Sequence, residues 1–271
     1  MKKVIILFES LHYDDEVFHL ISALNSIEPL SLTAVFLSPV DYTSIWAFPI
    51  VPGSSGAKVL PGSKEADKLL FTNIERFSSK CSEYGIRYKI HNDVNGVVFE
   101  QVKLESRFSD LMIIDTGTFY ADFGEQPNDY LKEVLHISEC PVLLIPPKSG
   151  LPQTVMLMYD GSESSIFAIK QFAYVFPVLR TLKTILVYVN AQEKEIPHID
   201  RMRELVQKLY PNIVFQILRD EKHYHSWFED HPYPIIVTGA YGRPAIIEFL
   251  RKSFLTDIIN DQQYFVFLAH K

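Results

Sequence analysis

The sequence predicts an α/β protein with two doubly wound domains, each built on a five-stranded parallel sheet. Three observations lead to this prediction. The chain has 271 residues, enough for two domains of ordinary size. Short apolar, β-branched runs alternate with longer segments whose apolar residues recur at helical spacing. This alternation occurs once on either side of Pro146 to Gly150, a stretch that reads as a linker.

The first half of the chain contains five runs that we expect to be strands and four segments that we expect to be helices. The runs are continuously apolar, which indicates strands buried on both faces of a parallel sheet. The expected strands are Val4–Phe8, Leu32–Leu37, Ile86–Ile90, Leu111–Ile114 and Val142–Ile145, and the expected helices are Asp14–Ile27, Ser63–Glu83, Gly96–Ser106 and Gln126–Ile137. The acidic run Asp14 to Glu16 would open the first helix at the positive end of its dipole.

The second half repeats the pattern, so we expect one domain over residues 1–147 and a second over 151–271. Val155–Tyr159 followed by Asp160 corresponds to Val4–Phe8 followed by Glu9. Asp110–Ile114 corresponds to Tyr233–Val237. The expected strands are Val155–Tyr159, Thr184–Val189, Val214–Leu218, Ile235–Val237 and Phe265–Leu268, and the expected helices are Ser162–Phe176, Lys194–Leu209, a short one near Lys222–Glu229 and part of Pro244–Asn260.

The connection Pro39 to Gly62 departs from the repeat. It is rich in Pro, Gly and Ser, yet it carries Trp46, Phe48, Ile50 and Val51. Long loops in compact domains are usually functional or disordered, and these apolar side chains argue against disorder. The connection is therefore either a loop packed on its own domain or a flap that covers a site or docks a partner.

Composition excludes several classes of protein. Lys and Arg number 26 and Asp and Glu 33, giving a net charge of −7, so no general attraction for nucleic acid or an anionic membrane is expected. No apolar run approaches a membrane span, and the run Val4 to Phe8 is too short for a secretory signal. Two cysteines make neither a disulfide framework nor a zinc site, and Cys140 is expected to be structural. We therefore expect a cytoplasmic protein.

The stretch Val237 to Pro244 is the most informative for function. Gly239 and Gly242 follow an apolar strand, where parallel sheets bind ligands and where glycine lets backbone amides approach a phosphate. A strand–turn–helix with Pro244 at the first helical position would explain the same residues. Asp160, after the first strand of the same half, could accept hydrogen bonds from ribose hydroxyls, and Asp160 or Ser162 could equally be a helix N-cap.

Both halves resemble the universal stress protein family, and the whole chain resembles a tandem pair of such domains. The resemblance is carried by Val4–Glu9, Asp110–Ile114 and Glu139–Pro146, and in the second half by Asp160–Ser162 and Val237–Gly242. It implies a five-stranded parallel sheet in each half. It also implies that some members bind ATP through a G-x2-G-x9-G-(S/T) pattern and an Asp after the first strand.

The second half matches that ATP pattern in part. Gly239, Gly242 and Ser253 fit it, whereas Lys252 stands where the family has glycine. The Lys252 side chain could block close approach of the backbone to phosphate, or its ammonium could attract the phosphate. A single helix from Pro244 to Ser253 would place Ser253 about 16 Å beyond Gly242, so the pattern requires the chain to fold back.

The first half departs further from the ATP pattern. Asp115 stands at the position of Gly239 and Thr118 at that of Gly242, while Asn128 and Asp129 replace the final Gly-Ser and Glu9 replaces the Asp. Carboxylates at these positions would repel a phosphate. We therefore expect at most one nucleotide per chain, bound in the second half.

These residues lead to two main hypotheses. The first is a stress-response regulatory protein that binds ATP with Mg²⁺, or another adenine nucleotide, through Asp160, Gly239, Gly242, Lys252 and Ser253. The second is a scaffold that binds no nucleotide and acts on an unidentified protein partner through Trp46 to Val51. An enzyme acting on a phosphorylated small molecule at the same cleft is a third. The residues assign no catalytic group, so enzymatic activity stays open.

Two further expectations concern metals and assembly. The stretch His223 to His231 is rich in candidate ligands, but an ordinary surface segment explains it without a metal. The resemblance to universal stress proteins, which often pair their last strands across a two-fold axis, implies that the two halves form an internal pseudo-dimer. Val142–Ile145 and Phe265–Leu268 would then meet antiparallel, which would remove two exposed sheet edges. A homodimer of the whole chain would be a further level of assembly.

Overall fold

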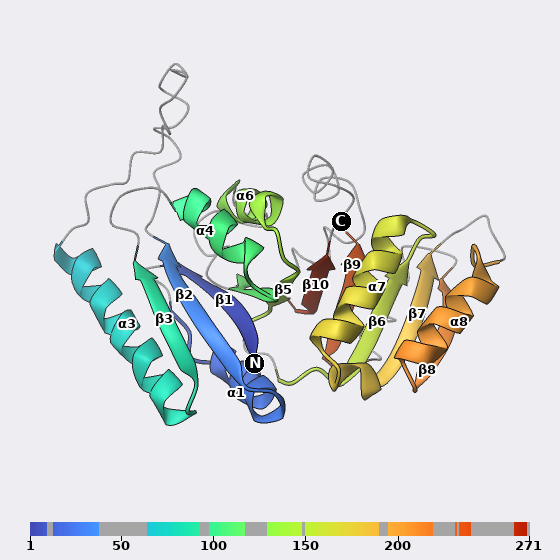
Figure 1. Ribbon diagram of the computed structural model, residues 1–271, viewed down its shortest axis with the longest axis horizontal. Coiled ribbons are helices and arrows are strands. Elements are labelled where there is room, and N and C mark those ends of the chain that lie inside the picture. Colours follow the sequence, from blue (N-terminus) through green and yellow to red (C-terminus); the bar gives the residue numbers. More distant parts are fainter. Residues whose placement is uncertain are drawn as a thin grey trace, which may run out of the picture.

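Ten strands of the computed structural model form one continuous sheet (Figure 1). The structure describes residues 1–9, 13–37, 64–92, 98–116, 129–147, 150–189, 195–218, 231, 233–239 and 263–269. The strands are β1 (Lys2–Glu9), β2 (Leu30–Leu37), β3 (Arg87–Asn92), β4 (Leu111–Asp115), β5 (Val142–Ile145), β6 (Thr154–Tyr159), β7 (Lys183–Val189), β8 (Ile213–Leu218), β9 (Pro234–Gly239) and β10 (Phe265–Ala269).

The strand order is β3-β2-β1-β4-β5-β10-β9-β6-β7-β8. Each half is parallel within itself, and its first strand lies in the middle of its five. The halves join where β5 and β10 pair antiparallel, with Leu143 opposite Phe267. The predicted fold class is confirmed, and so is the expected antiparallel meeting of these two strands.

Helices cover both faces of the sheet. The described ones are α1 (Val17–Ile27), α3 (Lys64–Glu83), α4 (Val98–Arg107), α6 (Asp129–Ile137), α7 (Glu163–Val175), α8 (Ile199–Leu209) and the short 3-10 turn η1 (Leu179–Thr181). Residues of α1, α3, α7 and α8 pack into one apolar core, and residues of α4 and α6 into a second core on the opposite face. Because strand side chains alternate between the faces, the continuously apolar strands fill both cores.

Aromatic side chains form much of the first of these cores. In the first half, Phe8 stacks on Phe36 with ring centroids 5.3 Å apart and meets Phe77 at 5.7 Å. In the second half, Phe172 of α7 meets Phe267 of β10 at 5.2 Å. Ring pairs in these geometries add to the free energy of burial, so they hold the helices in a fixed place on the sheet.

Two helices begin later than the sequence predicts. α1 starts at Val17, so the acidic run Asp14 to Glu16 lies just before the first turn, with Glu16 as the N-cap residue, and not within the helix as expected. Instead, Asp14 accepts a hydrogen bond from the Glu16 amide at 3.0 Å, and Asp15 pairs with Arg76 at 3.0 Å. α8 starts at Ile199 rather than near Lys194.

Other predictions fall outside the described residues or bear on function only indirectly. The connection Pro39 to Gly62 and the helices expected near Lys222–Glu229 and Pro244–Asn260 lie outside the described part of the chain. Within that part, no helix combines the length and the apolar character that crossing a bilayer requires. Cys140 is 5% exposed, and burial raises the pKa of its thiol to about 12, which supports the structural role expected for it.

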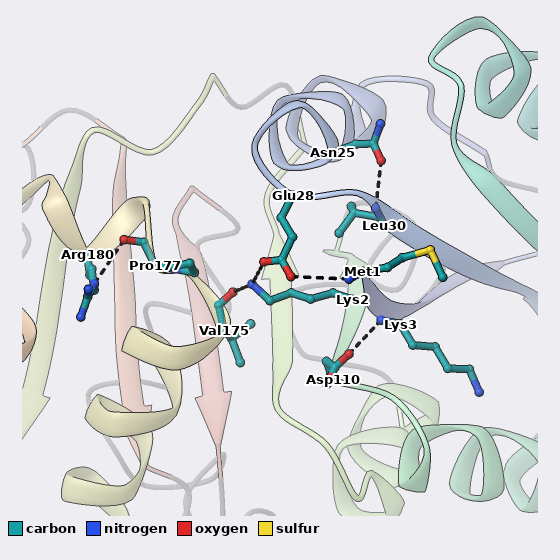
Figure 2. A network of polar contacts seen from close by, with 10 residues as sticks. All are labelled: Met1, Lys2, Lys3, Asn25, Glu28, Leu30, Asp110, Val175, Pro177 and Arg180. Atoms are coloured by element: carbon teal, nitrogen blue, oxygen red, sulfur yellow. Dashed lines mark hydrogen bonds and ion pairs between the residues drawn. The ribbon is translucent and has the colours of Figure 1, made fainter.

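A second contact joins the halves at the amino ends of the strands. The Lys2 ammonium lies 2.7 Å from a carboxylate oxygen of Glu28 and donates a hydrogen bond to the carbonyl of Val175, the last residue of α7 (Figure 2). The cationic side chain thus meets the negative end of the α7 dipole. The amino end of β1 is thereby attached to a helix of the second half.

Candidate functional site

The carboxyl ends of β6 and β9 lie side by side at the middle of the second half. β6 pairs with β7 on one side and with β9 on the other, so the strand order reverses at β6. In open α/β sheets this reversal point is where ligands bind. Asp160 and Gly161 follow β6 directly, and Gly239 ends β9. The structure therefore brings Asp160 and Gly239 to the same edge of the sheet.

Asp160 and Ser162 build the turn that leads into α7. A carboxylate oxygen of Asp160 accepts a hydrogen bond from the Ser162 amide at 2.9 Å, and the Asp160 side chain remains exposed. The Ser162 hydroxyl accepts from the Ser165 amide at 3.1 Å and is the N-cap of α7. Of the two alternatives for the cap, Ser162 is thus the correct one, and Asp160 orders the turn before it.

The segment before α8 packs against this turn. Gly161 has a φ of +85°, and a Cβ atom there would lie 3.3 Å from the Pro197 Cβ. The Tyr159 hydroxyl donates to the Pro197 carbonyl at 3.0 Å, so the end of β6 and the start of α8 are fastened together. His198, the N-cap residue of α8, has a left-handed backbone with φ of 52°, which explains why α8 begins late.

An open surface depression lies beside this segment, and its described wall runs from Glu195 to Arg201. The wall contains both acidic and basic side chains, among them Asp200 and Arg201, which are exposed. Sequence reasoning missed this wall, although Gly161 between a strand and a helix, and Pro197 just before a helix, are ordinary signals of fixed turns.

Gly239 has a packing role that its sequence pattern did not reveal. A Cβ atom at Gly239 would lie 2.2 Å from the Ser164 carbonyl carbon and 2.4 Å from the Ser165 nitrogen. The first turn of α7 therefore rests directly on the end of β9, which only glycine permits. A contact between Gly239 and a phosphate remains a prediction. Gly242, Lys252 and Ser253 lie outside the described residues, so their roles remain predictions as well.

The first half differs at the equivalent edge. With Glu9 matched to Asp160, the strand register places Leu111 at the position of Ile235 and Asp115 at that of Gly239. The matching of Asp110–Ile114 to Tyr233–Val237 is therefore wrong by one residue, whereas the replacement of Gly239 by Asp115 is correct. Asp115 is 5% exposed.

The side chain next to Asp115 closes this edge further. The Thr116 hydroxyl donates to the carbonyl of Ile145 at the end of β5, at 3.0 Å. The first half thus places a buried carboxylate and a hydroxyl at the point where the second half has a glycine against a helix N-terminus. Thr118 and Asn128 lie outside the described residues, and Asp129 begins α6.

The metal hypothesis gains no support from the described residues. Among them, no group of three His, Cys, Asp or Glu side chains is placed to hold a metal ion. The stretch His223 to His231 lies outside them, apart from His231 itself. Burial also raises the pKa of the Cys81 thiol to about 12, so neither cysteine is available as a thiolate at neutral pH.

Comparison with solved structures places the chain on a known fold. A universal stress protein from Archaeoglobus fulgidus DSM 4304 superposes with a TM-score of 0.68 at 12% identity, over 100% of this chain and 96% of that one. A putative universal stress protein from Pseudomonas aeruginosa UCBPP-PA14 gives 0.53 at 10% identity, over 100% and 93%. The cytoplasmic domain of a prokaryotic cation chloride cotransporter gives 0.52 at 11% identity, over 99% and 95%.

The chain therefore has the universal stress protein fold, over its whole length. No family model and no curated protein matches its sequence. At 10 to 12% identity the likeness establishes the fold alone. Function must therefore be inferred from the residues at the carboxyl ends of the strands in the two halves.

Proposed function

We propose that the second half binds one adenine nucleotide at the carboxyl ends of β6 and β9, and that the chain acts as a stress-response regulatory protein through this site. The asymmetry between the two halves is the observation that supports the proposal. The same strand position holds Gly239 under a helix N-terminus in the second half and the buried carboxylate of Asp115 in the first.

The carboxyl ends of β6 and β9 in the second half suit an anionic ligand for two reasons. The N-terminus of α7 carries the positive end of the helix dipole and lies at the strand ends, because Gly239 allows the helix to approach. Asp160, exposed on the turn before α7, can accept hydrogen bonds from ribose hydroxyls. At the equivalent strand ends of the first half, the buried carboxylate of Asp115 would repel a phosphate.

The nucleotide expected there is ATP with Mg²⁺, at one per chain. Gly242 and Ser253 would add contacts to its phosphates. Lys252, in place of a glycine, would either add attraction for the phosphates or keep the backbone away from them. No residue is assigned a catalytic role in this proposal.

Thermal unfolding with and without Mg-ATP tests the proposal. A ligand at about 100 times its dissociation constant adds about 2.7 kcal/mol to the free energy of unfolding, a shift of several degrees. Asp160→Ala should reduce the shift, and so should Asp160→Asn, which keeps an acceptor for the Ser162 amide but weakens the acceptor for the ribose. Because Asp160→Asn preserves the turn, it separates loss of ligand binding from loss of structure.

The matched control is Glu9→Ala, which alters the same strand end in the first half. This variant should leave the nucleotide-induced shift unchanged. Equal effects of Asp160→Asn and Glu9→Ala would contradict a single site in the second half. No shift at millimolar Mg-ATP would reject the proposal and favour the alternative, a scaffold that binds a protein partner through Trp46 to Val51, residues outside the described part of the chain.

A further inference from the structure

We propose that β8 pairs edge to edge with the β8 strand of a second copy of this chain, in a two-fold antiparallel register centred on Phe215. The proposal does not depend on nucleotide binding. It begins with the strands that the internal pseudo-dimer uses. Because β5 and β10 pair with each other, the outer edges of the described sheet are those of β3 and β8.

The two outer edges differ in charge. β3 reads Arg-Tyr-Lys-Ile-His-Asn and presents Arg87 and Lys89 as exposed side chains. Cationic residues on an edge strand prevent pairing with other strands. β8 reads Ile-Val-Phe-Gln-Ile-Leu and contains neither a charge nor a proline. An uncharged, β-branched edge of this length is a template for another strand unless something covers it.

The backbone of β8 presents its outer hydrogen-bonding groups in a regular pattern. Thr184 of β7 donates to the Asn212 carbonyl at 3.0 Å. Alternate residues of a parallel strand turn both backbone groups to the same neighbour, so Val214 and Gln216 face β7. The backbone groups of Ile213, Phe215 and Ile217 therefore face outward, and no described strand pairs with them.

The side chains of β8 leave room for a second strand. Ile213, Phe215 and Ile217 pack against the core that contains α8, and Arg203 of α8 lies 5.6 Å from the centre of the Phe215 ring. On the other face Val214 is 49% exposed and Gln216 is also exposed. These two side chains would meet the same two side chains of a partner strand.

A second copy fits this edge better than a foreign strand does. A two-fold axis at Phe215 pairs Ile213 with Ile217 of the other copy and Phe215 with Phe215. The outward-facing backbone groups of all three residues therefore meet outward-facing groups of the partner strand. Such pairing is closed, because each copy uses up its uncharged edge and leaves only the cationic edge of β3. The same chain already joins its halves by antiparallel edge pairing at β5 and β10.

Sedimentation velocity over a range of concentrations tests the proposal on the full chain. The wild type should show a reversible monomer–dimer equilibrium. Val214→Lys with Gln216→Lys places cations opposite each other across the two-fold axis and should weaken dimerisation at least about tenfold. Because the chain carries a net charge of −7, added lysines lower the overall repulsion, so dissociation would have to come from the local contact.

Two matched experiments accompany this variant. A chain with Val214→Glu and Gln216→Glu should form mixed dimers with the lysine variant, while each alone stays monomeric. Tyr88→Lys, on the exposed surface of β3, should leave dimerisation unchanged. Equal weakening by Tyr88→Lys would contradict the assignment to β8.

Cysteine pairing tests the register separately. In the proposed register Val214 lies opposite Gln216 of the other copy, about 4.5 Å apart at Cα, within reach of a disulfide. A Val214→Cys chain mixed with a Gln216→Cys chain should therefore cross-link under oxidation, and neither variant alone should do so. Native Cys81 and Cys140 are 0% and 5% exposed, so they should not take part in the cross-linking.

Three further results would overturn the proposal. The wild type could remain monomeric at millimolar concentration, the lysine variant could dimerise as tightly as the wild type, or cross-linking could occur equally in the single and mixed cysteine samples. A monomer whose Phe215 and Ile217 amides were protected from hydrogen exchange would show that the edge is covered from within the same chain. None of these results bears on the nucleotide proposal, which is measured by a ligand-induced shift.

Discussion

Gly239 decides how closely a helix can approach the sheet in the second half. A side chain there would collide with the backbone of α7 at Ser164 and Ser165. The first half has Asp115 at the same position, and its α1 does not lie against β4 in the way that α7 lies against β9. A single residue thus separates an edge with a helix N-terminus at the strand ends from one with a buried carboxylate.

Gly239→Ala should lower the free energy of unfolding by about 2 kcal/mol or more. The added Cβ would lie within 2.4 Å of backbone atoms, and helix backbone cannot move aside as a flexible side chain can. Urea denaturation measures the loss. Gly150→Ala is the control, because its Cβ would meet the Tyr233 ring at 3.5 Å, an ordinary contact, and should change stability little. Equal losses in the two variants would contradict the packing role.

At the scale of elements, α7 connects the candidate site to the junction between the halves. It spans Glu163 to Val175, so its first turn lies on Gly239 and its last carbonyl accepts the hydrogen bond from Lys2 (Figure 2). Over 13 residues this is a distance of about 20 Å. Burial of Phe172 against Phe267 holds the middle of the helix on the sheet.

Glu28→Gln should weaken the attachment of β1 to α7 in a pH-dependent way. The hydrogen bond from Lys2 holds the pKa of the Glu28 carboxyl below its usual value, with partial desolvation opposing. A lowered pKa in the folded state contributes stability at neutral pH that is lost as the pH falls through that pKa. Since Glu28 is 37% exposed, the loss at pH 7 should be about 0.5–1 kcal/mol, and it should be smaller at pH 3, where more of the carboxyl is protonated.

Urea denaturation at the two pH values measures this difference. The matched control is Glu83→Gln, which removes an exposed ion pair with Lys80 within a single helix. This variant should change stability less at pH 7, because the Glu83 side chain is 55% exposed and joins no separate elements. A Glu28→Gln loss that is the same at pH 7 and pH 3 would show that packing, not charge, is responsible.

At the scale of the whole molecule, the β5–β10 pairing makes one sheet of two halves. Phe267 lies at the centre of that pairing, opposite Leu143, and is fully buried against Phe172 and Phe176. A side chain at this place supports both halves at once, so we expect them to unfold together.

Phe267→Ala should lower the free energy of unfolding by about 3–5 kcal/mol, the cost of a large cavity in a core. Hydrogen exchange should show β1 of the first half and β7 of the second losing protection by the same amount. Tyr174→Ala is the control, because Tyr174 lies on α7 but is 60% exposed and should be nearly neutral. Loss of protection in β7 alone would show that the halves unfold independently.

Much of this architecture could be predicted because short, continuously apolar runs of sequence indicate buried strands. Runs such as Val142–Ile145 match the structure at both ends. The resemblance to universal stress proteins implies the internal pairing of β5 with β10, and the structure confirms it. Predictions failed where a turn overrode a helical pattern, as in α1 and α8. At α8, Pro197 and the left-handed backbone of His198 delay the helix, and periodicity cannot report such constraints.

The sequence by itself determined the fold class and, through its resemblance to the family's ATP pattern, the replacement of Gly239 by Asp115 in the first half, because burial patterns and glycine positions are local properties of the chain. Only the tertiary structure decided that Gly239 supports α7, that Pro197 packs on Gly161, and that β8 ends the sheet without a charge. These are contacts between segments far apart in the sequence, and their distances follow from packing, which local patterns do not encode.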